Sequence, residues 1–293
     1  MYITKVMEVK TLTGSQLPTR LLSIPNPPKQ LYCIGDVGLL EQELFAIVGS
    51  RVPSKDGVAT ARLFASHIAN TDMVIISGGA SGVDTIAHRA ALDAGKKTVV
   101  VFGNGFNYCF PQENQQLFNE VLEAGGLLIT EYPATQSPAK WTFPDRNRII
   151  SGLSRGVLVA EAGTKSGSLN TLKHARQQGR DIFVVPGART GSAAAGSNTY
   201  LENHPEACAM TPAVIVKRYG KTSSFGAGFT SSKGDGNPVL EALRKEALHI
   251  EEIGKITGMD IAELSSELTM LELTGAVTAH AGNYYSASLS DQT

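Results

Sequence analysis

The 293-residue sequence has few cysteines, no long apolar run and almost no net charge. Its three cysteines, Cys33, Cys109 and Cys208, are scattered and odd in number. They form neither a disulfide framework nor the ligand spacing of a metal site, so a reducing compartment is expected. A membrane helix needs about 18 consecutive apolar residues, and the sequence contains no such run. The first ten residues lack the apolar core of a signal peptide, so we expect a cytoplasmic protein.

The net charge of −1 gives the chain no general attraction for nucleic acid or for a membrane surface. Any charged partner must therefore be met by a local patch. A hydrophobic content of 42% with 18% charged residues is typical of a globular protein with a buried core.

The common cofactor signatures are also missing. No G-x-G-x-x-G follows the first predicted strand and no Walker motif is present, so neither NAD nor ATP is indicated and no cofactor is expected. The six histidines form no H-x-H or H-E-x-x-H pattern, so no metal site is predicted. The stretch GLSRG (152–156) matches a nucleophile elbow, but a helical segment precedes Ser154 and a strand follows it, which is the reverse of the required order.

Short apolar runs rich in Val and Ile alternate with helical patterns from residue 44 onward. Such runs are typical of strands buried on both faces, and alternating strand–helix units predict a doubly wound, mostly parallel sheet in an extended Rossmann-like α/β fold. The predicted strands are 45–49, 73–77, 98–102, 127–131, 157–161, 182–186 and 213–216. The predicted helices between them are 58–70, 83–95, 113–125 and 168–180.

The chain divides into four segments by composition. Residues 1–43 are mixed and proline-rich and are expected to be a lead-in segment with little structure. Residues 44–218 form the Rossmann-like domain, and 219–237, rich in Gly and Ser, are predicted to be a flexible linker. In 238–293, three short helical patterns and an alternating hairpin pattern predict a winged helix.

Four loops rich in Gly, Ser or Arg follow predicted strands: 49–57, 77–84, 162–168 and 186–198. Ligands of open α/β sheets bind at the carboxyl ends of the strands. Glycines there let backbone N–H groups approach an anion, and helix N-termini favour negative charge. The loops therefore predict a phosphate-bearing ligand, although each loop taken singly is also explained by tight turns and helix caps.

Positive charge is concentrated between residues 140 and 180, where eight Lys and Arg residues face two acidic ones. Cations combined with an aromatic platform are the usual elements of a single-strand nucleic-acid site. Phe143 is a candidate platform, with core packing as the alternative, whereas Trp141 is expected to pack in the core. His88 follows Asp84 by four residues, so a structural Asp84–His88 contact on one helix face is predicted rather than acid–base catalysis.

The C-terminal unit has the opposite charge. Residues 238–293 contain three basic and nine acidic residues, and the third predicted helix has no Lys or Arg. An acidic winged helix repels phosphate, so we predict that it contacts protein rather than DNA.

These motifs together resemble those of the DNA-processing protein A family, DprA or Smf. The matching stretches, in order from about residue 20 to 216, are FAIVGSR, SGGASGVDTIAH, FPQEN, TEYP, FPDRNRIISGLS, EAGTKSGSLNT and VVPG. The resemblance implies a non-enzymatic protein that binds single-stranded DNA, protects it, and loads RecA during natural transformation. It also implies a homodimer formed through the Rossmann domain.

The resemblance further implies the residues of the DNA site. Arg51, Lys140, Phe143, Arg146 and Arg148 correspond to the family's DNA-binding pocket. The loop with Lys165, Ser166 and Ser168 corresponds to its phosphate-facing loop. The neighbouring candidates in the same motifs are Gly49, Ser50, Ser54, Gly78, Gly79, Asn147 and Gly167.

Two other functions remain open from the sequence. One is a Rossmann-type nucleotide phosphoribohydrolase, although the nearest stretch to its signature, EAGTKSGS, lacks the following acid. The other is a transcription regulator that reads duplex DNA through the winged helix, which the acidity of that unit disfavours.

Overall fold

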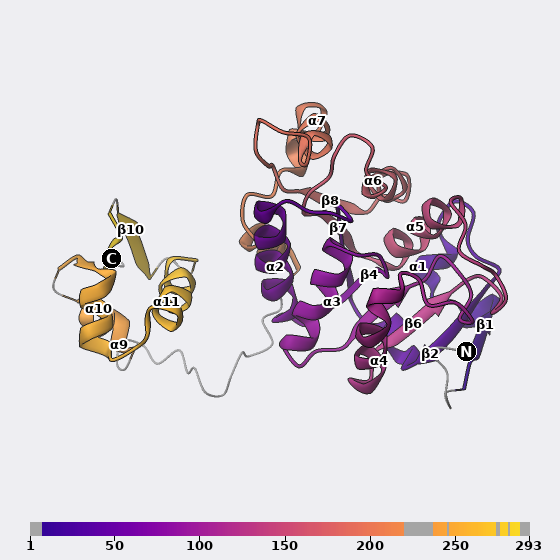
Figure 1. Ribbon diagram of the computed structural model, residues 1–293, viewed down its shortest axis with the longest axis horizontal. Helices are drawn as coiled ribbons and strands as arrows, with labels where there is room; N and C mark the ends of the chain where they lie inside the picture. Colours follow the sequence, from indigo (N-terminus) through magenta and orange to yellow (C-terminus); the bar gives the residue numbers. More distant parts are fainter. Residues whose placement is uncertain (1–7, 220–236, 245, 274–275, 281, 288–293) are drawn as a thin grey trace. The chain divides into compact units, whose positions relative to one another are not determined.

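The computed structural model describes residues 8–219, 237–244, 246–273, 276–280 and 282–287 (Figure 1). The chain divides into two compact units, Met1–Ser223 and Ser224–Thr293. Most of the predicted linker, residues 220–236, lies outside the described residues. Within the part that is described, no helix is long and apolar enough to cross a membrane.

The larger unit is built on one eight-stranded sheet with the order β1-β2-β6-β5-β4-β3-β7-β8. Its strands are β1 (Lys10–Thr13), β2 (Gln30–Gly35), β3 (Leu44–Val48), β4 (Val74–Gly78), β5 (Thr98–Val101), β6 (Leu127–Thr130), β7 (Gly156–Val159) and β8 (Asp181–Val184). The six strands from β3 to β8 pair in parallel, whereas β1 and β2 join antiparallel beside β6. The doubly wound, mostly parallel fold predicted from the sequence is confirmed.

Helices cover both faces of this sheet (Figure 1). The α-helices are α1 (Thr19–Leu22), α2 (Lys55–Ala69), α3 (Val83–Asp93), α4 (Gln115–Glu123), α5 (Thr142–Leu153), α6 (Ser168–Gln177), α7 (Ala195–Asn203) and α8 (Ala213–Tyr219). Short 3₁₀ turns occupy Gly14–Gln16, Val37–Glu41, Gln112–Asn114 and Pro205–Ala207.

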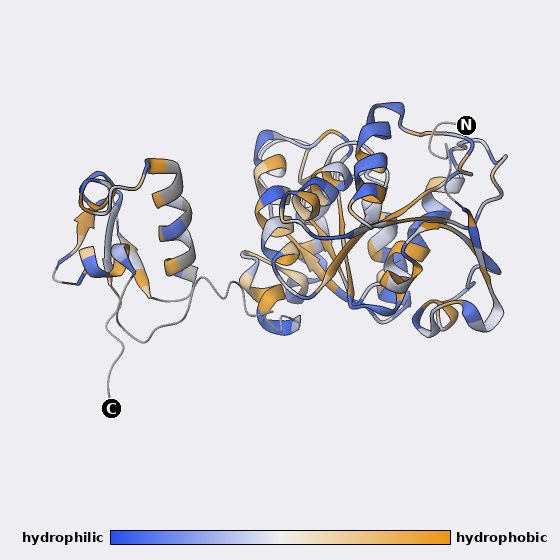
Figure 2. Cartoon of the chain, turned by 90° about the horizontal axis from the view of Figure 1, so that it is seen from below, coloured by the Kyte–Doolittle hydropathy of each residue, from blue (hydrophilic) through white to orange (hydrophobic). Residues whose placement is uncertain are grey.

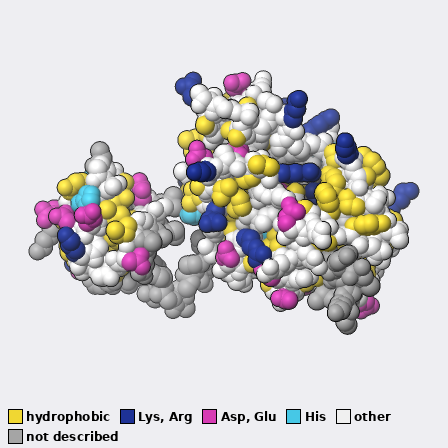
Figure 3. Space-filling model, viewed as in Figure 1, with side chains coloured by type: hydrophobic (Ala, Val, Ile, Leu, Met, Phe, Trp, Pro, Cys, Tyr) yellow, Lys and Arg dark blue, Asp and Glu magenta, His cyan; other side chains and the backbone are white. Residues whose placement is uncertain are grey.

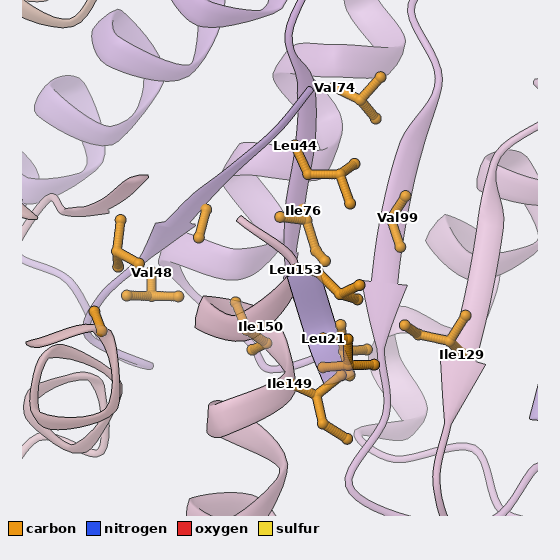
Figure 4. Close-up of a cluster of buried hydrophobic side chains, with 14 of the residues drawn as sticks. Leu21, Leu44, Val48, Val74, Ile76, Val99, Ile129, Ile149, Ile150 and Leu153 are labelled. Carbon is orange, nitrogen blue, oxygen red and sulfur yellow. The ribbon is translucent and has the colours of Figure 1, made fainter. Parts of the chain in front are cut away.

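Alternation along each strand assigns its side chains to two cores. In β3, Leu44, Ala46 and Val48 pack on the face covered by α1, α5 and α6, whereas Phe45 and Ile47 pack against α2 and α3 on the other face. Figure 4 shows the first of these cores, with Ile149, Ile150 and Leu153 of α5 and Leu21 near the strand side chains. The central strands are largely apolar in Figure 2, as expected for a sheet whose middle is buried on both sides, whereas the edge strand β1 is mostly exposed.

The prediction that residues 1–43 have little structure is wrong for residues 8–43, the part that the structure describes. β2 pairs with β6, and its Leu31 and Cys33 are fully buried in the core. α1 packs against α5, where Gly152 leaves room for the side chains of Leu21 and Ile24. The proline-rich stretch 25–28 is only the connection between α1 and β2. Its proline content therefore indicated a turn and not the structure of the whole segment.

The predicted strand at 213–216 is also wrong, because these residues begin the helix α8. Only Ile215 of the run is buried, and Val214 remains 45% exposed. An apolar run of four residues cannot by itself distinguish a strand from one face of a helix. Pro212 directly before the run, whose carbonyl accepts from the Val216 N–H, was the signal for a helix start.

The smaller unit is the predicted winged helix. It contains α9 (Pro238–Ala242), α10 (Ile250–Thr257), α11 (Ile261–Leu273) and a three-stranded sheet of β9 (Leu248–His249), β10 (Val277–His280) and β11 (Tyr284–Ala287). Its core includes Val239, Leu243, Ile253, Leu264, Leu268 and Val277. The helix predicted from 238 is shorter than its apolar pattern, because the chain turns into β9 at Leu248.

Candidate nucleic-acid interface

The sheet order creates a topological switch point between β3 and β7. From β3 the chain adds β4, β5 and β6 on one side, and it then returns to add β7 and β8 on the other side. Loops that leave β3 and β7 therefore diverge at the carboxyl edge of the sheet, which is where ligands of open α/β sheets bind.

A groove of about 810 Å³ lies at this edge. It is formed by the loops after β3 and β7, the start of α5 and the segment before α5. The predicted site residues that line it are Gly49, Ser50, Arg51, Lys140, Phe143, Arg146, Asn147, Lys165, Ser166, Gly167 and Ser168. Segments more than a hundred residues apart in sequence thus meet in one concavity, as the sequence predicted.

Positive charge dominates the groove. Its charged lining residues are Arg51, Lys140, Arg146, Lys165 and a single carboxylate, that of Asp84. Arg51, Lys140 and Lys165 are exposed, and no ion pair is recorded for them among the described residues. Figure 3 shows Lys and Arg side chains gathered near the middle of the larger unit, beside hydrophobic side chains. Arg51 is close enough to Asp84 to lower the pKa of that carboxyl. Exposed cations without an ion-pair partner, such as Lys140 and Lys165 among the described residues, are available for an anionic ligand.

Arg146 belongs to the floor of the groove. Its side chain is 4% exposed, donates through Nη1 to the Val101 carbonyl, and donates through Nε to Asn147 Oδ1 at 3.2 Å. Burial lowers the pKa of Arg146 to about 10, which leaves it cationic at neutral pH, and the nearby Asp84 carboxylate opposes that shift. Burial also raises the pKa of Asp84, while Arg146 acts in the opposite direction.

Two glycines of the predicted site act by leaving space. A Cβ on Gly78 would lie 2.5 Å from Asp84 Oδ2 and 2.6 Å from the Arg146 guanidinium, so a side chain at Gly78 would displace this pair. A Cβ on Gly49 would lie 2.9 Å from the Glu161 carbonyl, where the loops after β3 and β7 touch. Both glycines therefore shape the groove without contributing a side chain to it.

An aromatic wall borders the groove. The Arg51 guanidinium lies over the Phe143 ring at 5.4 Å, and the Phe143 and Phe110 rings are 5.3 Å apart. A smaller pocket of about 250 Å³ on the other side of this wall shares Arg51, Phe110, Phe143 and Arg146 with the groove. Phe143 is half-buried and its ring borders both spaces, which is the exposure that a stacking platform requires.

The loop after β7 presents backbone and hydroxyl groups. Ser166 Oγ and Ser168 Oγ are 2.7 Å apart, and Gly167 caps the N-terminus of α6, whose first residue is Ser168. The dipole at the start of α6 favours an anion, although the N–H groups of residues 168–170 already donate within the loop. Lys165 adds a full positive charge at the same place.

Arg148 does not join the groove, and its prediction as a site residue is corrected. It is 6% exposed and pairs with Glu131 at 2.6 Å and with Asp145 at 3.6 Å. Arg146 and Arg148 are both within α5, where residues two apart point to different sides of the helix. The sequence placed them beside a turn, from which both could have converged on one ligand.

Ser54 also lies away from the groove. Its Oγ accepts from the Gly57 N–H at 3.0 Å as the N-cap of α2, and its hydroxyl donates to the Glu161 carboxylate. Gly79 lines only the smaller pocket, and Gly78 lines neither. These residues support the groove from behind.

Two further side-chain predictions are wrong. Trp141 is 60% exposed, with an edge contact to Tyr132 at 5.9 Å, rather than packed in the core. His88 is fully buried, but its Nε2 donates to the Gly78 carbonyl at 2.8 Å and its Nδ1 lies 2.8 Å from Thr98 Oγ1, so the predicted Asp84 contact is not formed.

Sequence reasoning missed several groove residues. Among them are Asp84, Phe110, Thr164 and Ser192. Thr164 and Ser192 lie inside loops that had been identified, so their position was the available signal. Asp84 ends the identified loop 77–84, so its position was a signal too, whereas Phe110 comes from the loop after β5, which only tertiary structure brings to this edge.

The chain matches known proteins over both units. The family model for DNA recombination-mediator protein A matches residues 8–219, and the model for the DprA winged helix domain matches residues 230–283. Protein Smf of Escherichia coli strain K12 is 33% identical over 281 residues, covering 91% of this chain and 74% of that protein.

Solved structures give the same result. DNA processing protein A from Streptococcus pneumoniae superposes with a TM-score of 0.67 at 34% identity, over 74% of this chain and 76% of that one. DNA processing protein A from Helicobacter pylori, which was studied for its single-stranded DNA binding mode, superposes with a TM-score of 0.65 at 29% identity, over 73% of this chain and 96% of that one. The chain therefore belongs to the DNA recombination-mediator protein A family, DprA or Smf.

Proposed function

We propose that this chain binds single-stranded DNA in the groove at the switch point and breaks no covalent bond there. The observation that carries the proposal is the convergence of Arg51, Lys140, Arg146 and Lys165 beside the Phe143 ring in one concavity. Cations neutralise successive phosphates, and backbone and hydroxyl groups of the 163–168 loop add hydrogen bonds to the same oxygens. The Helicobacter pylori relative with a described single-strand binding mode supports this assignment.

Membership of the recombination-mediator family supports a proposal for what the chain does with the bound strand. As a recombination mediator, the chain is proposed to protect incoming single-stranded DNA and to load RecA onto it during natural transformation. We further propose that it works as a homodimer in the cytoplasm and that the acidic winged helix contacts protein rather than DNA. RecA assembly on single-stranded DNA, followed by light scattering, should be faster with the chain present. Sedimentation of the free protein tests the dimer.

A salt series tests the groove directly. Affinity for single strands should exceed affinity for duplex, and it should fall with salt at a log–log slope of roughly −0.7 per phosphate neutralised. Arg51→Ala should weaken binding to all sequences alike and reduce the slope by about one such increment.

Arg62→Ala is the matched control, because Arg62 is exposed on α2 and does not line the groove. Equal losses from Arg51→Ala and Arg62→Ala would mean that binding is diffuse surface attraction and that the groove is not the site. A preference for duplex would favour the regulator hypothesis instead.

A further inference from the structure

Trp141, the single tryptophan of the chain, is exposed beside the groove. It follows directly after Lys140, which lines the groove, and it immediately precedes the first residue of α5. Trp141 does not itself line the groove, and 60% of its surface is exposed. An indole left in solvent loses the stabilisation that burial of its large apolar surface would give. Packing within the larger unit therefore does not explain this side chain.

The turn that carries Trp141 is fixed before any ligand binds. The Thr142 N–H donates to the Ala139 carbonyl at 3.1 Å, and the Thr142 hydroxyl donates to the same carbonyl at 2.8 Å. The Trp141 and Tyr132 rings meet nearly at a right angle, with centroids 5.9 Å apart. Tyr132 is 8% exposed and its hydroxyl donates to Asp145 Oδ2 at 3.1 Å, so it is a rigid support. A preorganised ring loses little conformational freedom when a base stacks on it.

The charges around Trp141 favour an anionic chain. Lys140 is exposed, and no ion pair is recorded for it among the described residues. The two carboxylates that flank this segment in the sequence, Glu131 and Asp145, pair with Arg148 at 2.6 and 3.6 Å. A cation beside an aromatic ring is the arrangement that binds single strands, because the cation attracts a phosphate while a base stacks on the ring.

Continuity with the groove favours a nucleic acid over a protein as the ligand of Trp141. The segment that leads to it, TQSPAK (135–140), is polar at four of its six positions and includes a lysine, a residue type that is depleted in protein–protein interfaces. Phe143, two residues further along the chain, borders the groove. A strand that stacks one base on Phe143 and continues over Lys140 therefore arrives at Trp141.

We propose that Trp141 is a second stacking platform for the single strand, for a base that lies just outside the groove on the Lys140 side. The proposal rests on the proposed single-strand function and extends it, because it assigns a binding role to a residue outside the groove. Every base has a π-face, so the platform adds affinity without sequence preference. The strand that one chain contacts is then longer than the groove alone.

The intrinsic fluorescence of the full chain tests the platform directly, because it reports on a single tryptophan. Oligothymidylates of about 4 to 16 nucleotides should quench the emission of the wild type once they are long enough to pass Lys140. The quenching should saturate together with the anisotropy of a labelled oligomer, and the bound strand should protect Trp141 from acrylamide. Added salt should restore the emission as the strand dissociates.

Variants measure what the platform contributes to affinity. Trp141→Ala should weaken binding of the long oligomers by about 5- to 150-fold, the equivalent of stacking one base, and should leave the shortest bound oligomers unchanged. Trp141→Phe keeps an aromatic ring and should retain most of the affinity. Leu63→Ala is the matched control and should bind as the wild type, because Leu63 is an apolar side chain of α2 that is 43% exposed and does not line the groove. Arg51→Ala should weaken all lengths, because it acts in the groove.

Wild-type binding without a change in emission would overturn the platform, and so would unchanged long-oligomer affinity in Trp141→Ala. A change in the oligomeric state of Trp141→Ala without a change in affinity would also overturn it and assign the ring to a second copy of the chain. In these cases a loss of affinity in Arg51→Ala would still support the groove. If the wild type binds no single strand of any length, the proposed function itself fails and the platform fails with it.

Discussion

At the scale of single residues, Phe143 has two alternative roles, as a packing residue or as a stacking platform for a base. Its ring contacts Arg51 and Phe110, and its edge lies close to Gly103. Phe143→Ala should weaken single-strand binding by about 1–3 kcal/mol, because a base loses its stacking partner. Fluorescence anisotropy with a labelled oligothymidylate measures this loss. Urea unfolding of the same variant separates binding from stability, and unchanged affinity would return Phe143 to a purely structural role.

His88 should make the protein sensitive to acid. Burial lowers its pKa to about 4, and Arg146 acts in the same direction. Above an unfolded pKa of about 6.5, both states are neutral and His88 adds no pH dependence. As the pH falls, the unfolded state takes up a proton that the folded state refuses, so stability decreases by about 2 kcal/mol at pH 5.

The comparison of His88→Gln with the wild type isolates this effect. The buried Asp84, whose pKa is raised by burial, is present in both proteins, so its opposite pH dependence largely cancels. Urea unfolding at pH 7 and pH 5, followed by the fluorescence of the single tryptophan, Trp141, reports on the larger unit. An equal loss in both proteins between the two pH values would show that His88 is not the acid-sensitive group.

At the scale of elements, Ser54 links the start of α2 to the end of β7. Its hydroxyl caps α2 and donates to Glu161, whose carboxylate also accepts from the Ser54 N–H at 2.9 Å. Ser54→Ala should cost about 1 kcal/mol of stability through the lost cap, with little change in single-strand affinity. Thermal unfolding and anisotropy on one sample test both statements. A clear loss of affinity without loss of stability would restore Ser54 to the binding site.

The elements that sequence predicted well are those with a strong local pattern. Strands β3 to β8 are continuous apolar runs bounded by turn residues, so burial on both faces was readable from composition alone. The positions of the glycine-rich loops were predicted from the ends of the strands. In the structure, the topological switch point brings these loops together. What failed depended on partners remote in sequence: β2 is a strand because β6 offers it an edge, and α8 is a helix where four apolar residues were ambiguous.

For the candidate site, too, the sequence predicted the loop residues correctly and one of the helical residues wrongly. Arg51, Lys140 and Lys165 lie in loops, where direction is not fixed by a helical period, and they do line the groove. Arg146 and Arg148 lie in α5, so one turns to Val101 of the sheet and the other to Glu131. Recognising that α5 already begins at Thr142 would have separated them, because the helical rotation alone excludes a shared ligand.

At the scale of the whole molecule, the two units carry opposite net charge. Every groove residue lies in the larger unit, between Val48 and Ser192. A chain ending at residue 219 should therefore keep its single-strand affinity. It should bind somewhat more tightly at low salt, because removal of the acidic unit leaves a net positive protein.

Single-strand affinity of the truncated and full chains, measured in parallel at low and at physiological salt, shows which unit makes the DNA contacts. A difference that disappears as salt rises identifies long-range charge as its cause, because screening shortens the reach of the acidic unit. Loss of binding in a truncated chain that still unfolds cooperatively would place an essential DNA contact in the winged helix, against the repulsion expected from its acidic residues. The expected outcome is that the truncated chain binds single strands more tightly than the full chain at low salt and equally tightly at high salt. That result would assign all the DNA contacts to the loops after β3 and β7 and to the start of α5.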